Sequence, residues 1–153
     1  MADAGGAAVA DRLDVIETCT RVVWHTDQRE WERLGEVFAD RVSLDYTSLN
    51  GGEPVTLAPE VIIGAWRDAL GGYDSTHHLL TNHLVTVAGD EAVCTAAFLA
   101  THRLGSALGG SLWTLGGTYR FSLTRSDRWR IDGMVMTAVW GDGNRDLPAQ
   151  AAK

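Results

Sequence analysis

Trp24-His25-Thr26-Asp27-Gln28-Arg29-Glu30-Trp31 is the stretch around which the fold of this sequence is organised. A largely apolar helical stripe runs into it and consists of Leu13, Ile16, Thr20 and Val23. Asp27 occupies the next position of that stripe, so it is predicted to face the protein core. A buried carboxylate must find a hydrogen-bonding partner or take up a proton. Asp27 therefore either caps the next helix or serves a functional site.

Helical patterns flank this stretch and recur once more along the chain. Residues 9–26 are predicted to form a first helix, and residues 27–38 a second helix with Asp27 as its N-cap. A third helix is expected to begin at Pro59 and to end at Gly71-Gly72, because proline favours the first turn of a helix and glycine ends one. The first half of the chain is therefore predicted to be mainly helical.

The second half of the chain has the pattern of long β-strands. Residues 42–47 alternate in polarity, which places Tyr46 on the apolar side of an earlier strand, and residues 55–57 form a short return strand after a turn at residues 50–52. Four longer strand-like segments follow at residues 76–87, 92–104, 112–125 and 129–140. Helices followed by an antiparallel meander predict an α+β fold, in which a curved sheet wraps around the helices and leaves a pocket at one end.

Length and charge limit the classes of function. A chain of 153 residues with 45% hydrophobic residues fits one domain, expected at residues 8–141, with flexible tails at residues 1–7 and 142–153. A net charge of −7 with scattered basic residues argues against nucleic acid as a partner. The sequence has neither a signal-peptide pattern nor an apolar segment of about 20 residues, so we expect a cytoplasmic protein without a membrane partner.

The register between the first two long strands decides which histidines meet. A three-residue loop, Gly89-Asp90-Glu91, places His78 opposite His102 on one face, whereas a two-residue loop places His77 opposite His102. We favour the three-residue loop because the positions that share a face with His78 are then mostly apolar. These positions are Leu80, Asn82 and Leu84, with Phe98 and Ala100 beside His102.

An interior that contains Asp27, Tyr46, His78 and His102 has the groups needed to remove a proton from carbon. A carboxylate bonded to one imidazole nitrogen fixes the tautomer and raises the basicity of the other nitrogen, which can accept a proton from carbon next to a carbonyl. The Tyr46 phenol can donate a hydrogen bond to the enolate oxygen that develops. The sequence therefore predicts proton abstraction followed by elimination or isomerisation.

The sequence is similar to the SnoaL-like branch of the nuclear transport factor 2 superfamily, and within it to scytalone dehydratase and hexachlorocyclohexane dehydrochlorinase. The residues that carry the resemblance are Asp27, Glu30-Trp31-Glu32-Arg33-Leu34, Leu44-Asp45-Tyr46, Thr76-His77-His78, His102, Trp129-Arg130-Ile131 and Trp140-Gly141. The resemblance implies a cone-shaped α+β barrel, no cofactor and a homotrimer. No metal site is expected, because the histidines lack the close pairing or the added Cys and carboxylate ligands of a metal centre.

The resemblance also assigns roles to single residues. Asp27 and His78 match the catalytic dyad of both enzyme families, while Tyr46 and His102 match the water-holding tyrosine and the second active-site histidine of scytalone dehydratase. Arg125 falls about where the dehydrochlorinase has an active-site arginine. The expected substrate-binding residues are Trp24, Asn82, Trp113, Tyr119 and Arg125.

Two positions depart from scytalone dehydratase. Thr26 stands where that family has a second catalytic tyrosine, and Tyr119 falls roughly where it has a substrate-positioning asparagine. The departures leave the substrate open but keep the dyad, so the expected function is a cofactor-independent lyase acting on a small cyclic or polycyclic ketone-type metabolite. An isomerase or polyketide cyclase with the same base, an epoxide hydrolase using Arg103 and Asp132, and a non-catalytic binding module are the alternatives.

If the dyad is present, its geometry is specific. A carboxylate oxygen of Asp27 should lie within hydrogen-bonding distance of a ring nitrogen of His78, inside a cavity.

Overall fold

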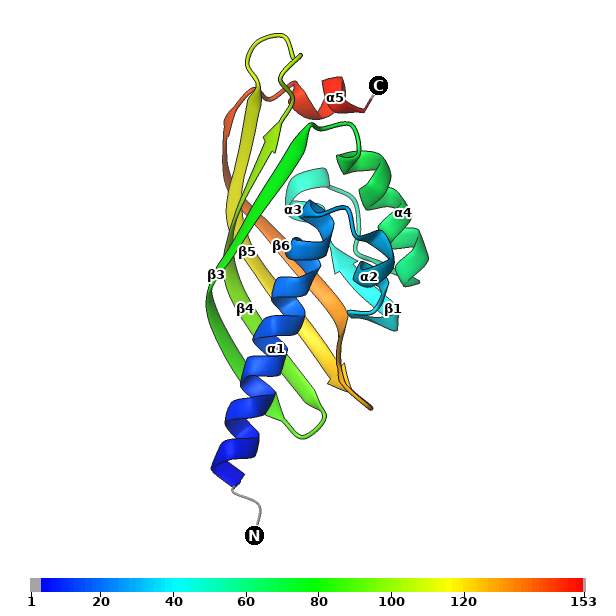
Figure 1. Ribbon diagram of the computed structural model, residues 1–153, viewed down its shortest axis with the longest axis vertical. Coiled ribbons are helices and arrows are strands. Elements are labelled where there is room, and N and C mark those ends of the chain that lie inside the picture. The colour runs from blue at the N-terminus through cyan, green and yellow to red at the C-terminus, as the bar shows by residue number, and fades with distance from the viewer. Residues whose placement is uncertain (1–3, 153) are drawn as a thin grey trace.

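The computed structural model describes residues 4–152 and consists of a curved six-stranded sheet with α-helices packed on one face (Figure 1). The strands are β1 (Phe38–Asp45), β2 (Val55–Leu57), β3 (Ser75–Ala88), β4 (Glu91–Arg103), β5 (Leu112–Arg125) and β6 (Trp129–Gly143). The helices are α1 (Ala4–Asp27), α2 (Trp31–Gly35), α3 (Thr47–Asn50), α4 (Pro59–Leu70) and α5 (Leu147–Ala151). None of the helices in this described part of the chain is long and apolar enough to cross a membrane.

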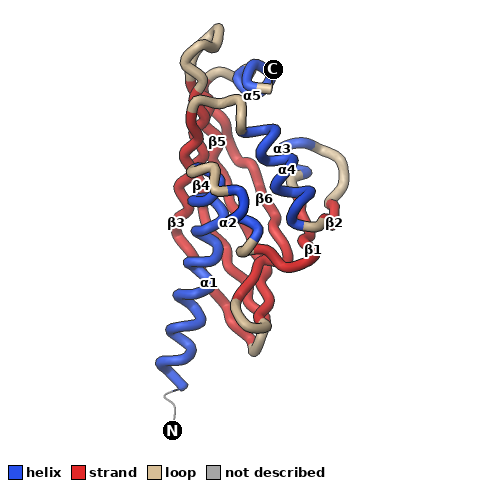
Figure 2. Tube along the Cα trace, turned by 45° about the vertical axis from the view of Figure 1, so that its right-hand side comes forward, coloured by secondary structure: helices blue, strands red, loops and turns tan. Residues whose placement is uncertain are grey.

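The sheet has the strand order β2-β1-β6-β5-β4-β3 and does not close into a barrel. Every neighbouring pair is antiparallel except β1 and β6, which run parallel. This confirms the predicted α+β class with a curved, mixed sheet, because the helices come first and the long strands follow as a meander. Figures 1 and 2 show α1 lying along the face of this sheet.

Helix α1 turns a different side to the sheet from the one predicted. Its most deeply buried side chains are Val15, Cys19, Val22 and Thr26, and Val23 of the predicted stripe is buried as well. The predicted stripe lies one position further along, which is a rotation of about 100° on a helix. Leu13 from that stripe is 61% exposed. The prediction of the buried face was therefore wrong by one residue, and Asp27 lies at the edge of that face.

Helix α1 ends in a Schellman motif, in which a residue of left-handed conformation closes the last turn. Arg29 has a φ of 61°, and its amide N–H donates to the carbonyl oxygen of Thr26, while the N–H of Glu30 donates to His25. Glycine usually occupies the position of Arg29 because it has no Cβ. Asp27 is consequently the last helical residue of α1, and its predicted role as an N-cap is wrong.

The second helix is shorter than predicted. Residues 27–38 were expected to be helical, but α2 covers Trp31–Gly35 only, with Glu30 before it. The chain enters β1 at Phe38, ahead of the predicted start at residue 42, and Tyr46 follows the strand instead of belonging to it. Alternation within a strand did not show where the strand begins, because the preceding residues also carry apolar side chains.

The loop between β3 and β4 has two residues. Ala88 pairs with Glu91, which leaves Gly89-Asp90 as the turn, and Gly89 has a φ of 62° that suits glycine. The prediction of a three-residue loop was therefore wrong. A two-residue loop alone would have turned His78 away from the interior.

A β-bulge at Asn82 and His83 reverses that consequence. The register of β3 against β4 shifts there by one residue, and Asn82 has a φ of 58°. On the loop side of the bulge the odd-numbered Val85 is buried, whereas on the other side the even-numbered His78 faces inward. Asn82 is exposed and Leu84 is 72% exposed, so neither shares the interior face with His78 as predicted.

His78 and His102 lie on the same face but are not directly paired. His78 is opposite Ala100, and Thr76 is opposite His102. The two imidazoles are therefore diagonal neighbours, with ring centroids 6.0 Å apart. The predicted pairing was wrong, whereas the predicted shared face is present because of the bulge.

Residues 142–152 are folded, whereas a flexible tail was expected at residues 142–153; Lys153 lies outside the described residues. Strand β6 continues to Gly143, and α5 buries Leu147 completely and Ala151 almost completely against Tyr73 and Leu104. Figure 2 shows α5 folded back at the end of the sheet. At the other end of the chain, residues 1–3 of the expected tail lie outside the described residues, and Ala4 already belongs to α1.

Truncation of Leu147 tests whether α5 is part of the fold. We expect Leu147→Ala to lower the free energy of unfolding by roughly 2–4 kcal/mol, because it leaves a cavity under a fully buried side chain. Leu108→Ala, at a leucine that is 83% exposed, is the matched control and should change stability little. Urea denaturation measures both variants, and equal small effects would indicate a loose tail.

Candidate active site

A cavity of about 500 Å³ lies between the helices and the inner face of the sheet. Its walls are mainly apolar and aromatic, with contributions from Trp66, Phe98, Trp113, Leu115 and Met136. Polar side chains also line it, among them Tyr46, Tyr73, His78, His102, Tyr119 and Arg145. A concave, mainly apolar site with a small number of polar groups is the usual form of a small-molecule binding site.

Asp27 lies directly behind His78 and accepts three hydrogen bonds from one strand. The His78 ring nitrogen Nδ1 is 2.7 Å from Oδ1 of Asp27, and the backbone N–H of His78 donates to Oδ2 over 2.7 Å. The Thr76 hydroxyl donates to Oδ1 over 2.9 Å. The predicted contact between carboxylate and imidazole is therefore present, with 11% exposure for each side chain.

The charge of Asp27 determines the tautomer of His78. Burial by itself raises the pKa of Asp27, but the hydrogen bonds from His78 and Thr76 together outweigh it and lower the pKa below its usual value. The carboxylate is then ionised near neutral pH and can only accept hydrogen bonds. The proton between the two groups accordingly lies on Nδ1 of His78. This leaves Nε2 of the neutral ring with a free lone pair.

His102 has a neutral partner in place of a carboxylate. Its Nδ1 lies 3.1 Å from the carbonyl oxygen of Trp113, so Nδ1 carries the proton and donates it. Burial lowers the pKa of His102, the hydrogen bond to the Trp113 carbonyl opposes this in part, and the nearby His78 adds a smaller lowering effect. His102 is therefore a neutral imidazole near pH 7, and its Nε2 can accept a hydrogen bond.

Two tyrosines supply hydrogen-bond donors on the opposite side of the cavity. The rings of Tyr46 and Tyr119 meet edge to face with centroids 6.5 Å apart, and Trp66 packs against Tyr46 at 6.4 Å. Burial raises the pKa of both phenols, and for Tyr46 the Tyr119 hydroxyl adds to the effect. Both hydroxyls therefore keep their protons and can donate to an oxygen atom of a ligand.

The structure brings together six of the nine residues predicted for the site. Tyr46, His78, His102, Trp113 and Tyr119 line the cavity, and Asp27 contacts His78 from behind. The other three lie elsewhere. Trp24 is 58% exposed on the outer side of α1, and Asn82 is exposed in the bulge of β3.

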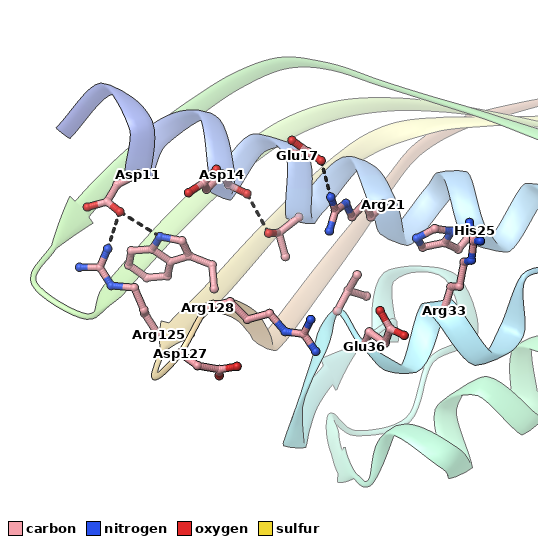
Figure 3. Close-up of a pocket in the computed structure, with 13 residues that line it drawn as sticks. Asp11, Asp14, Glu17, Arg21, His25, Arg33, Glu36, Arg125, Asp127 and Arg128 are labelled. Atoms are coloured by element: carbon pink, nitrogen blue, oxygen red, sulfur yellow. Dashed lines mark hydrogen bonds and ion pairs between the residues drawn. The ribbon is translucent and has the colours of Figure 1, made fainter. Parts of the chain in front are cut away.

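Arg125 is the third residue outside the cavity, and it lies in a surface groove at the far end of the sheet (Figure 3). Its guanidinium contacts the carboxylates of Asp11 and Asp90 and stacks over the Trp129 ring with its Cζ atom 4.6 Å from the centroid. These contacts join α1 to the turns at the ends of the strands. Arg125 is therefore held by ion pairs and a stacking contact, and it lies outside the cavity that contains the other predicted residues.

Several residues of the cavity and of the Asp27 contacts were not predicted. Thr76 could have been found, because it lies two residues before His78 in a strand and so shares its face. Tyr73 and Arg145 come from irregular segments that give no periodic signal. Among the described residues there is no group of three His, Cys, Asp or Glu side chains placed to hold a metal ion.

The sequence profile of the SnoaL-like domain matches residues 7–135. The chain belongs to the SnoaL-like domain family. No curated protein matches the sequence. A solved protein of Kribbella flavida, Kfla4162, is 28% identical, with a TM-score of 0.85 over 94% of this chain and 99% of that one.

Two further solved structures have enzyme names. A Novosphingobium aromaticivorans protein, provisionally named a scytalone dehydratase, is 16% identical with a TM-score of 0.79 over 92% of both chains. The hexachlorocyclohexane dehydrochlorinase LinA-type3 of Novosphingobium barchaimii is 15% identical, with a TM-score of 0.75 over 90% of this chain and 92% of that one. At this identity the likeness establishes a shared fold, as the sequence resemblance implied.

The lowered pKa of His102 predicts a pH dependence of stability. In the unfolded chain this imidazole titrates near about 6.5, whereas the folded protein holds it neutral to lower pH. Its contribution to stability is thus complete above the unfolded pKa and is lost as the pH falls below it. Partial burial also lowers the pKa of His83, which acts in the same direction.

We therefore expect the free energy of unfolding to fall between pH 7.5 and 5.5, and to fall less in His102→Gln. Urea denaturation at the two pH values measures the difference. His77→Gln is the control, because His77 is exposed on the outer face. An equal fall in the protein and in His102→Gln would contradict the role of His102.

Proposed function

We propose that the protein is a cofactor-independent lyase that removes a proton from carbon next to the carbonyl of a small cyclic metabolite. The observation that carries the proposal is the hydrogen bond of 2.7 Å between Asp27 and His78, whose ring lines a largely apolar cavity of about 500 Å³. The names of the dehydratase and dehydrochlorinase with the same fold agree with this class of reaction.

In the proposed reaction Nε2 of His78 takes the proton from carbon. The electron pair of the broken C–H bond moves toward the carbonyl oxygen, and the Tyr46 hydroxyl donates a hydrogen bond to the enolate that forms. The negative charge of Asp27 stabilises the imidazolium on His78. Collapse of the enolate then forms a carbon–carbon double bond and expels the leaving group from the next carbon.

The leaving group determines where the proton goes. The imidazolium of His78 can return its proton to a departing hydroxyl, which leaves as water, whereas a halide departs without one. His102 is neutral, so it does not supply this proton. Its Nε2 instead accepts a hydrogen bond and orients a hydroxyl of the substrate.

An isomerase or cyclase is the second candidate, and the state of His102 favours it. Apart from the Asp27–His78 pair, the described cavity residues include no group that is an acid near neutral pH. A single base that removes a proton and returns it to another atom suffices for isomerisation. Deuterium exchange from the substrate without release of water or halide would identify this reaction.

Variants of the dyad test the proposal. We expect Asp27→Asn and His78→Ala to lower kcat by roughly 10²–10⁴-fold on any hydroxy-ketone or halo-ketone that the protein converts, because both disable the same base. His77→Ala is the matched control, since this neighbouring histidine points away from the cavity. Undiminished turnover in both dyad variants would refute the mechanism.

We further propose that the protein forms a homo-oligomer through the outer face of the sheet, a trimer by its resemblance to the two enzyme families. Leu79, Leu99, Gly116 and Trp140 form one uncharged row across four strands. Leu79 is 49% exposed and Trp140 is 50% exposed, which leaves apolar surface for a second copy.

Light scattering on size-exclusion chromatography tests this association. Leu79→Lys should shift the protein to monomer, because it places a charge in the centre of the apolar row. Leu108→Lys, in the exposed loop between β4 and β5, should leave the assembly unchanged. A monomeric wild-type protein would contradict the proposal.

A further inference from the structure

Arg145 gives the cavity a positive charge that the dyad does not require. Among the described residues that line the cavity, Arg145 is the one with a permanent charge, and none is Asp or Glu. The whole chain has a net charge of −7. A single arginine in a largely apolar cavity without carboxylates, in an acidic protein, therefore marks the local place where an anion is favoured.

The backbone around Arg145 is held on both sides. The Asn144 side-chain amide donates to the carbonyl oxygens of Leu108 and Gly110 over 2.9 and 2.8 Å. Leu147 is completely buried two residues after Arg145. Arg145 is therefore presented by an anchored segment and not by a free chain end.

The sheet places this segment beside the histidine end of the cavity. Gly143 pairs with Trp113, and Trp113 pairs with His102. Arg145 follows Gly143 by two residues, so it joins the cavity wall near the strand ends that carry His102. A ligand held by Arg145 would consequently extend toward the reacting groups.

The Arg145 guanidinium has no ion pair and no hydrogen bond to any described residue. Four arginines of the described chain pair with carboxylates, among them Arg21 with Glu17 and Arg130 with Asp127, whereas Arg145 lines the cavity without such a partner. Arginine presents a planar set of donors that matches a carboxylate. The donors of Arg145 are thus free for a ligand.

We propose that Arg145 is a specificity-determining residue that binds an anionic group of the substrate, and that the substrates are ring compounds carrying a carboxylate or an equivalent acid. The apolar wall holds the ring, and Arg145 holds the acid at the rim. This inference rests on the proposed function only in placing the substrate in the same cavity. The new element of the inference is that the substrate carries a negative charge, which the Asp27–His78 dyad does not specify.

Binding of two matched probes tests the proposal without turnover. Naphthalene-2-carboxylate and naphthalene-2-carboxamide have the same ring and differ in charge, and quenching of the cavity tryptophans or titration calorimetry measures their affinity. We expect the carboxylate to bind at least about fivefold more tightly than the amide, as for a partly exposed ion pair. Raising the salt concentration should reduce this preference.

Variants of two arginines distinguish a specific contact of Arg145 with the carboxylate from a general effect of the net charge of the protein. Arg145→Gln should remove the preference for the carboxylate and leave amide binding unchanged, and Arg145→Lys should retain part of it. Arg120→Gln is the matched control, because it makes the same change in net charge at an exposed residue outside the cavity lining. The preference should persist in Asp27→Asn, so failure of the dyad mechanism would not affect this result.

Three results would overturn the proposal. The first is equal binding of the two probes, or no binding of either, by the wild-type protein. The second is an equal loss of affinity for both probes in Arg145→Gln, which would indicate that Arg145 has a purely structural role. The third is the same loss of carboxylate preference in Arg120→Gln, which would indicate a general effect of net charge.

Discussion

The buried carboxylate of Asp27 is the constraint on which the arrangement of helix and sheet depends. An ionised group removed from water needs hydrogen-bond donors, and Asp27 obtains three of them from Thr76 and His78 of one strand. The same bonds fix the last turn of α1 against β3 and hold the His78 ring in one orientation. Removing either partner would leave an uncompensated charge or an unfixed imidazole. The hydrogen bonds of Asp27 therefore contribute both to the stability of the fold and to the orientation of the proposed base.

The β-bulge at Asn82 and His83 resolves two demands on β3 that a regular strand cannot meet together. Near the turn, Val85 must face inward, where it forms part of the buried core. Further along, His78 must face the same way to reach Asp27. These positions differ by an odd number, whereas side chains on one face of a regular strand are separated by even numbers. One extra residue restores the alternation at the expense of a local irregularity.

The parts of the structure that were predictable are those encoded by local patterns. Polarity periods gave the helices and long strands, and the resemblance placed Asp27 and His78 together. The bulge was not predictable, because the sequence around Asn82 alternates as readily without it. The buried face of α1 was predicted one residue away from its position, because Leu13 is apolar yet exposed. Arg125 shows the limit of transferring single residues, since its contacts with Asp11 and Trp129 depend on how distant segments meet.

The two imidazoles of the cavity differ in what holds their Nδ1 proton, and this difference assigns their roles. Nδ1 of His78 faces an ionised carboxylate, which favours a positive ring once Nε2 has taken a proton. Burial disfavours a positive ring at His102 and the nearby His78 adds to this, while the bond from Nδ1 to the neutral carbonyl of Trp113 offsets only part of the effect. When two neighbouring titratable groups have different environments, one can act as a base while the other stays neutral. The cavity therefore has one base, and any proton that reaches a leaving group must come back from that base.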